Sequence, residues 1–235
     1  MPRSHPPTLI TLARAALRDH AMIPRGTSVL VAVSGGPDSM ALLHVLALLR
    51  ARNGFGLYAH GVDHGLRPEA AAELDLAETF ARSLDVPFAR TAVDVHPGGN
   101  VQARARAARW DALRTAASRM GAARIATGHH ADDRAETVVL RLLRGTGLRG
   151  LAAIPPVDGD RIRPLVHARR ADVEAHLGRH GVPFAVDPSN VNPRFLRARV
   201  RAEVMPALER LSPRITEHLC DLADEASRHR TRERA

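Results

Sequence analysis

The chain has 235 residues, of which 45% are hydrophobic and 25% are charged. This composition is typical of a folded globular protein and excludes an intrinsically disordered chain. The length accommodates one α/β domain with a small appendage. No apolar run is long enough to cross a membrane, and the residues before Arg14 lack the apolar core of a signal peptide, so we expect a cytoplasmic protein with no membrane partner.

The formal net charge is +9, and arginine supplies all of the basicity because the sequence contains no lysine. A basic surface attracts polyanions, which makes nucleic acid the leading candidate partner. A GC-rich genome that encodes Arg in place of Lys explains the same composition, so both interpretations stay open. Cys220 is the only cysteine. The sequence therefore excludes a disulfide framework and a set of cysteine ligands for a cluster.

Apolar spacing predicts alternating helices and strands along most of the chain. A helix is expected at residues 9–20, and the continuous apolar run at 29–33 indicates a strand that is covered on both faces. Further strands are expected at 56–62, 88–95 and 124–127, and further helices at 40–49, 69–84, 101–120 and 132–143. This order predicts an α/β fold, a doubly wound parallel sheet of the Rossmann-like kind, with ligands beyond the carboxyl ends of its strands.

The composition changes after Gly145. Residues 144–156 are rich in Gly and Pro and are expected to form a surface loop. A strand at 162–166, a helix at 169–180, a turn-rich stretch at 182–193 and an Arg-rich helix from 195 onward follow. We therefore divide the chain into an N-terminal helix (1–24), an α/β domain (25–190) and a short helical C-terminal extension (191–235).

A glycine-rich segment follows the first predicted strand, and it consists of Ser34, Gly35, Gly36, Pro37, Asp38 and Ser39. Glycines let backbone N–H groups converge, and a helix N-terminus adds partial positive charge, so the segment is typical of an anion cradle. It lacks the GK[ST] ending of loops that transfer a γ-phosphate. Asp38 can carry Mg²⁺ on the phosphates. The alternative is an ordinary Gly-rich turn between a strand and a helix.

A second cluster of polar residues lies at the end of the 124–127 strand, and its members are His129, His130, Asp132, Asp133 and Glu136. The three acidic residues fall within one helical turn, so we expect them to share one face toward a metal or an amine. A zinc site is the rival interpretation, although the two histidines are adjacent and no cysteine joins them. An acidic cluster that stabilises the helix N-terminus is the third.

The string VLVAVSGGPDS resembles the PP-loop of N-type ATP pyrophosphatases, and within that group the chain is similar to the tRNA(Ile)-lysidine synthase family. Four further segments match the family pattern in order over roughly residues 25 to 210: VDHGLR at 62–67, QARARAARWDAL at 102–113, ATGHHADDRAET at 126–137 and DPSN at 187–190. The family usually has Glu where this chain has Gln102, and tends to have Asn where it has Ala198.

The resemblance implies a reaction in which the wobble cytidine of a tRNA(Ile) with a CAU anticodon attacks the α-phosphate of ATP. Free L-lysine then displaces AMP to form lysidine. It also implies the cofactors ATP and Mg²⁺. The residues implied are Ser34 to Ser39, His64, Arg106 and Gly128 for ATP, Asp38 for the metal, Asp38, His129, Asp132 and Asp133 for catalysis, and Asp132, Asp133 and Glu136 for the lysine amine.

Arg194, Arg197 and Arg201 recur at spacings of three and four, which predicts a stripe on one helix face that could track tRNA phosphates. Family members commonly carry further C-terminal domains that hold tRNA, so we expect this chain to depend on the stripe. The alternative is a solvated face or one paired within the chain, with Glu203 and Glu209 as available partners.

Two other functions stay open. A tRNA thiolation enzyme has the same loop but ordinarily uses cysteines, for which Cys220 is a poor candidate. A catalytically degenerate nucleotide-binding or RNA-binding protein would account for Gln102 and Ala198. The sequence does not fix the oligomeric state, for which a homodimer is one expectation.

Overall fold

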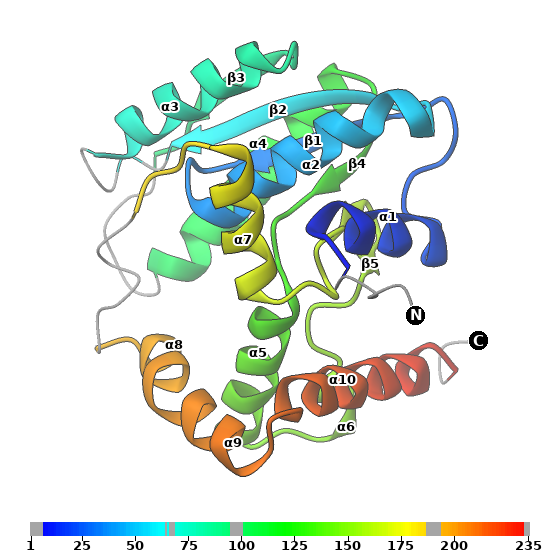
Figure 1. The fold of residues 1–235 in the computed structure, drawn as a ribbon. Coiled ribbons are helices and arrows are strands. Elements are labelled where there is room, and N and C mark those ends of the chain that lie inside the picture. The colour runs from blue at the N-terminus through cyan, green and yellow to red at the C-terminus, as the bar shows by residue number, and fades with distance from the viewer. Residues whose placement is uncertain (1–6, 64, 66–68, 95–100, 187–193, 233–235) are drawn as a thin grey trace.

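The computed structural model describes residues 7–63, 65, 69–94, 101–186 and 194–232 (Figure 1). Its centre is a six-stranded sheet with the order β3-β2-β1-β4-β6-β5. All neighbouring strands are parallel except β5, which pairs antiparallel with β6. The strands are β1 (Ser28–Val33), β2 (Gly56–Asp63), β3 (Phe88–Ala92), β4 (Ala122–Ala126), β5 (Val157–Asp158) and β6 (Arg161–Ile162). The predicted doubly wound sheet is confirmed, with a short antiparallel strand added at one edge.

Helices cover both faces of this sheet. One face carries α1 (Leu9–Asp19), α2 (Pro37–Asn53), α3 (Glu69–Ser83) and α7 (Arg170–His180), whose apolar residues join one core cluster. The other face carries α4 (Val101–Arg119), which packs on β1 and β4 in a separate cluster. The expected helices are therefore present, with ends that shift by at most four residues.

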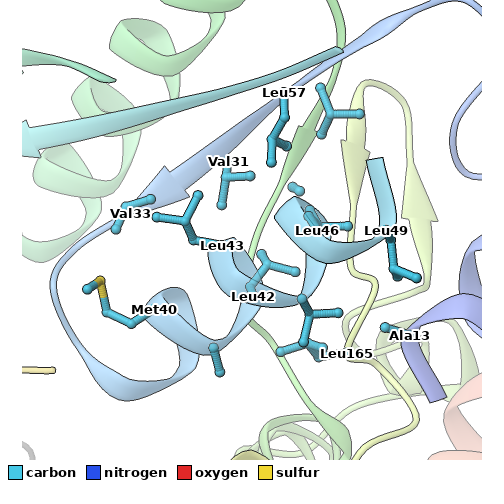
Figure 2. Close-up of a cluster of buried hydrophobic side chains, with 14 of the residues drawn as sticks. Ala13, Val31, Val33, Met40, Leu42, Leu43, Leu46, Leu49, Leu57 and Leu165 are labelled. Atoms are coloured by element: carbon cyan, nitrogen blue, oxygen red, sulfur yellow. The ribbon is translucent and has the colours of Figure 1, made fainter. Parts of the chain in front are cut away.

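The side chains of β1 explain why this strand is apolar along its whole length. Val31 and Val33 point toward α2, where Figure 2 shows them beside Leu43 and Leu46. Leu30 and Ala32 point to the opposite face and pack under α4. Successive side chains of a strand alternate between faces, so a strand covered on both sides buries all of them.

The strand order sets the place of the ligand site. The chain runs from β1 outward through β2 to β3, and then returns to place β4 on the other side of β1. This reversal leaves a crevice between the carboxyl ends of β1 and β4, which is where open α/β sheets bind ligands. The Ser34 segment follows β1, and the His129 segment follows β4.

A helical region lies below the sheet in Figure 1, built around α5. It contains α5 (Ala131–Leu143), α6 (Leu148–Leu151), α8 (Leu196–Arg199), a π-helical turn η2 (Val200–Val204), α9 (Met205–Leu211) and α10 (Ile215–Arg232). Their apolar residues form a further core cluster. Buried Arg134 of α5 pairs with Asp224 of α10. The predicted division of the chain at residues 24 and 190 remains a prediction.

Three expectations for the second half of the chain need correction. The stretch 144–156 contains helix α6 and buries Leu151, so it is not simply a surface loop. The strand expected at 162–166 ends at Ile162. The single helix expected from 195 onward is broken into α8, η2, α9 and α10. Within the described residues, every helix is too short or too polar to span a lipid bilayer.

Candidate functional site

A cavity of ≈ 650 Å³ opens at the crevice between β1 and β4. Its walls come from the end of β1, the start of α2, α4, the end of β4, the start of α5, the start of α7, and α8 with η2. Its size is in the range of small-molecule sites. The lining residues predicted from sequence are Ser34, Gly36, Pro37, Asp38, Ser39, Gly128, His129, Asp133, Arg197 and Arg201.

The glycine-rich loop is held in a fixed shape. Gly35 has φ +80°, and a Cβ there would lie 2.5 Å from the carbonyl oxygen of Glu73, so the position requires glycine. Ser39 Oγ donates to the carbonyl oxygen of Gly36 at 2.9 Å and accepts from the backbone N–H of Ser34 at 3.1 Å. Pro37 is the first residue of α2. The loop thus meets a helix N-terminus, as an anion cradle requires.

Gly128 allows β4 to end directly against this loop. A Cβ at Gly128 would lie 2.7 Å from the carbonyl oxygen of Asp38 and 3.1 Å from the backbone nitrogen of Ser39. This close approach brings the residues after β4 next to the first turn of α2. It explains why a glycine precedes the two histidines.

Asp38, His130 and Asp133 form the acidic centre of the site. His130 Nε2 lies 3.7 Å from Asp38 Oδ1 and 3.5 Å from Asp133 Oδ2, and its ring is fully buried. Among the described residues, neither ring nitrogen has a hydrogen-bond partner of good geometry. Burial lowers the pKa of His130, but Asp132, Asp133 and Asp38 outweigh it, so the net shift is upward. Burial raises the pKa of Asp38.

These donor groups fit a divalent cation. One ligand atom each from Asp38, His130 and Asp133 lie within 4.8 Å of one another. Two carboxylates beside a phosphate cradle suit Mg²⁺, which is usually held by one or two carboxylates and the substrate's phosphates. The zinc alternative centred on both histidines is not supported, because His129 lies outside this group.

His129 lines the cavity as predicted, in a neutral state. Its Nδ1 lies 2.9 Å from Thr127 Oγ1. Burial lowers its pKa to about 4, against the opposing effect of Asp133, so the imidazole carries no charge at pH 7. A neutral imidazole there can exchange hydrogen bonds with a ligand without adding charge.

Asp132 does not share a face with Asp133 and Glu136, which corrects the expectation from sequence. Its carboxylate accepts hydrogen bonds from the backbone N–H of Arg170 at 2.7 Å and from Arg169 Nε at 3.1 Å. These contacts tie α5 to the first turn of α7, and they hold the pKa of Asp132 below its usual range despite burial. Asp132 is therefore turned away from the cavity.

The predicted arginine stripe is found only in part, because Arg197 and Arg201 meet at the same carboxylate, that of Glu136. Its role in tRNA binding remains a prediction. Arg194 precedes α8, and η2 interrupts the regular helical spacing between Arg197 and Arg201. Arg197 donates to Asp133 at 2.9 Å and to Glu136 at 3.1 Å, and Arg201 donates to Glu136 at 2.6 and 2.9 Å. Pairing within the chain is thus observed for these two arginines.

The partners of the arginines differ from those proposed from sequence. Glu203 pairs with Arg199, and Glu209 pairs with Arg169. Asp133 and Glu136 accept from Arg197 and Arg201 instead. Glu136 is only 2% exposed, so its charge depends on these guanidinium groups.

A second hollow of ≈ 260 Å³ adjoins the cavity and shares Ala32, Ser34 and Arg109 with it. His60, Val62 and Leu113 are among its other lining residues, and its largely apolar walls suit a flat base. Arg109 rather than Arg106 reaches both spaces, while Arg106 is exposed on α4. His64, expected at the nucleoside end of ATP, lies outside the described residues, as does the DPSN segment.

Among the polar residues that line the cavity, three were absent from the sites predicted by sequence: Arg109, Thr127 and Arg170. Arg109 and Thr127 fall inside the matched segments at 102–113 and 126–137, so their positions carried a signal. Arg170 begins α7, and no motif marks it. Only the folding of α7 against α5 places its guanidinium 3.8 Å from Glu136.

Comparison with known proteins places this site in a family. Residues 12–208 match the model of the PP-loop domain. The chain is 41% identical over 223 residues to a tRNA(Ile)-lysidine synthase of Thermobifida fusca, covering 94% of this chain and 69% of that one. It belongs to the tRNA(Ile)-lysidine synthase family of PP-loop proteins. The predicted family is confirmed.

A second family member, the tRNA(Ile)-lysidine synthase of Symbiobacterium thermophilum, is 40% identical over 228 residues, which cover 92% of this chain and 47% of that one. The chain thus spans about half to two thirds of the length of the curated relatives it matches. The U34-tRNA thiolase NcsA of Methanococcus maripaludis, solved with its [4Fe-4S] cluster, has the same fold, with a TM-score of 0.78, 16% identity, and coverage of 93% and 78% of the two chains.

Proposed function

We propose that this chain ligates lysine to the wobble cytidine of tRNA(Ile) with a CAU anticodon. ATP first adenylylates the base and releases pyrophosphate, and the side-chain amine of free lysine then displaces AMP to form lysidine. The proposal includes a cytoplasmic site of action, where tRNA, ATP and lysine are available. Family membership and the content of the cavity both support it.

One observation carries the proposal: a phosphate cradle and a pair of carboxylates, one half-buried and one buried, face the same cavity at the switch point of the sheet. The cradle spans Ser34 to Ser39, and the pair is Asp38 with Asp133. An α-phosphate attack needs in-line positioning and neutralisation of the departing pyrophosphate rather than a protein nucleophile. The cradle and the two carboxylates supply groups suited to the second requirement, and the walls of the cavity would serve the first.

Each part of the cavity has a proposed role. The loop N–H groups with Ser34 and Ser39 bind the pyrophosphate, and the adjoining hollow holds the adenine. Asp38 and Asp133 are the residues that would hold Mg²⁺, which supplies charge neutralisation at the phosphates when bound. Arg109 reaches both spaces and is positioned to contact the nucleotide between base and phosphates.

Asp133 and Glu136 of α5 form an acidic wall that offers a site for the lysine amine. Both Glu136 oxygens accept hydrogen bonds from Arg197 and Arg201, and both Asp133 oxygens accept as well, one from Arg197 and one from the backbone N–H of His130. Only Asp133 lines the cavity. We therefore assign the cationic amine to Asp133 Oδ1, where it would take the place of Arg197, while Oδ2 faces His130 and the proposed Mg²⁺ position. Glu136 contributes negative charge. Asp132 is left out of this role because Arg169 and Arg170 occupy it.

A thiolation reaction is disfavoured by the sulfur chemistry of the chain. Its one cysteine, Cys220, is buried and donates to the carbonyl oxygen of Ala131 at 3.4 Å. Burial raises its pKa to about 11, so the reactive thiolate is scarce at neutral pH. A degenerate protein would bind nucleotide or RNA without forming product, so measuring product formation distinguishes it from an enzyme.

The test is a reaction of purified protein with ATP, labelled lysine and a CAU-anticodon tRNA(Ile). We expect label in tRNA, together with AMP and pyrophosphate in equal amounts. The same tRNA with its wobble cytidine replaced by uridine serves as the substrate control, and Asp38→Asn as the protein control. Products of ADP and phosphate, or tRNA binding without label incorporation, would contradict the proposal.

A further inference from the structure

Three histidines meet between α2 and α7, away from the cavity. His44 comes from α2, and His176 and His180 come from α7, one helical turn apart. The ring centroids of His44 lie 5.1 Å from those of both His176 and His180, and the latter two rings are 4.5 Å apart. His44 Nδ1 and His176 Nε2 are 2.9 Å apart. Figure 1 shows α7 lying alongside α2.

The cluster is graded from the interior to the surface. His176 is only 4% exposed, His44 is half-buried, and His180 is exposed. Phe80 packs against the His44 ring at 5.9 Å between centroids and forms an apolar wall. One side is therefore closed by protein and the other is open to solvent, as in metal sites that keep a position for water.

The chemistry of the three side chains suits a transition metal. Imidazole nitrogen is a preferred ligand of Zn²⁺, Ni²⁺ and Cu²⁺. Histidines four residues apart on a helix lie on the same face, as in the helical zinc motif. With Zn–N distances of about 2.0 Å, a tetrahedral site separates its ligand atoms by about 3.3 Å. The His44–His176 pair has to open by a few tenths of an ångström. The exposed His180 ring has to turn toward it, because the three side chains as placed do not bring one nitrogen each within 4.8 Å of one another.

A second histidine pair in the chain provides an internal comparison. His20 and His167 lie with their Nε2 atoms 3.0 Å apart and their rings stacked at 5.3 Å. Two imidazoles alone bind a metal more weakly than three, and these two come from separate elements. A real three-histidine site should therefore be distinguishable from a general affinity of clustered histidines for metals.

We infer that His44, His176 and His180 form a surface site for a transition-metal dication such as Zn²⁺. The bound ion would join α7 to α2, the helix whose first turn carries the phosphate loop. This site is separate from the proposed catalytic function and does not depend on it. It also differs from the Asp38 centre in its donors, because all three of its protein ligands are nitrogens.

The experiment is calorimetric titration of the untagged full chain with Zn²⁺ at pH 7.5, above the ordinary pKa of histidine. A millimolar excess of Mg²⁺ competes for the carboxylates of the Asp38 centre. We expect one Zn²⁺ per chain, an affinity at least about tenfold weaker in His180→Ala, and an unchanged affinity in His167→Ala and Asp38→Asn. His180 is exposed, so its replacement should leave the fold intact.

A second readout uses Co²⁺, whose visible absorption reports a site with several nitrogen ligands. The absorption should appear in the wild type, weaken in His180→Ala and disappear in His176→Ala. Equal Zn²⁺ affinity in the wild type and His180→Ala would overturn the inference. So would a wild-type dissociation constant above about 100 μM, equivalent to about 5.5 kcal/mol, or binding that is lost in Asp38→Asn.

Discussion

Replacing Gly128 with alanine tests how tightly the end of β4 packs on the phosphate loop. The new Cβ would lie 2.7 Å and 2.8 Å from the carbonyl oxygen and carbon of Asp38, where ordinary contact begins at 3.4 Å. The two segments must therefore separate by about 0.7 Å or more. Overpacking costs about 1–3 kcal/mol, and we expect the upper half of this range because both neighbours are backbone atoms.

The assay is thermal unfolding together with ATP binding. For a protein of this size, a loss of about 2–3 kcal/mol lowers the melting temperature by about 4–12 °C. ATP affinity should fall as well, because Asp38 and Ser39 belong to the displaced turn. The matched control is Gly147→Ala, where a Cβ meets nothing within 4 Å and φ is −81°.

The control should melt only about 1–4 °C below the wild type and keep its ATP affinity, since a glycine-to-alanine change at a helix N-cap costs about 0.5–1 kcal/mol. A Gly128→Ala variant with wild-type melting temperature and wild-type ATP affinity would refute the reasoning. It would mean that the approach of β4 to α2 can relax without cost.

Three further predictions follow from the same contacts. Asp38→Asn should lower lysidine formation by more than about tenfold, or about 1.4 kcal/mol of activation free energy, while circular dichroism shows an intact fold. Arg197→Ala combined with Arg201→Ala should lower the free energy of unfolding by about 1–3 kcal/mol in urea, because buried Glu136 loses its partners. The salt dependence of tRNA binding should stay unchanged in this variant. If the slope of log binding constant against log salt concentration instead became shallower by about one per arginine, both arginines would be tRNA contacts. Burial lowers the pKa of His60 below its unfolded value of 6.5. The contribution of neutral His60 to stability is therefore present above pH 6.5 and is lost as pH falls. The free energy of unfolding of the wild type should decline below pH 6.5, and His60→Gln should make this decline shallower by at most about 1.4 kcal/mol per pH unit.

Local patterns in the sequence were sufficient to predict the sheet and the phosphate loop. The apolar run of β1, the two glycines and Pro37 each act through neighbouring residues, so their effect is readable without the rest of the fold. The position of Gly128 at the carboxyl end of β4 follows from strand order. The need for glycine at this position could not be predicted from the strand order, because it depends on the distance to the Asp38 turn, 90 residues earlier.

The partners of the acidic residues on α5 could not be predicted from local sequence patterns. Asp132 and Asp133 are adjacent, and only the docking of α7 decides that the first binds Arg169 while the second faces the cavity. Arg197 and Arg201 find Glu136 across separations of 61 and 65 residues. Helical spacing predicted the shared face of the arginines but carried no information on which acids that face would meet.

The contacts of α5 show that α8 and η2, which follow residue 194, form part of the cavity wall. One side of α5 places Asp133 and Glu136 against Arg197 and Arg201, and the opposite side packs Ala135 and Val138 into the cluster shared with α10. Removing those helices would leave the 2% exposed carboxylate of Glu136 with Arg170 at 3.8 Å as its remaining observed cation. A buried carboxylate without good partners is strongly unfavourable, so its charge or its position would have to change. The geometry around Asp133 and Glu136 is therefore set by residues from α5 and from α8 with η2, and any ligand that contacts Asp133 Oδ1 must compete with the Arg197 guanidinium already bound there.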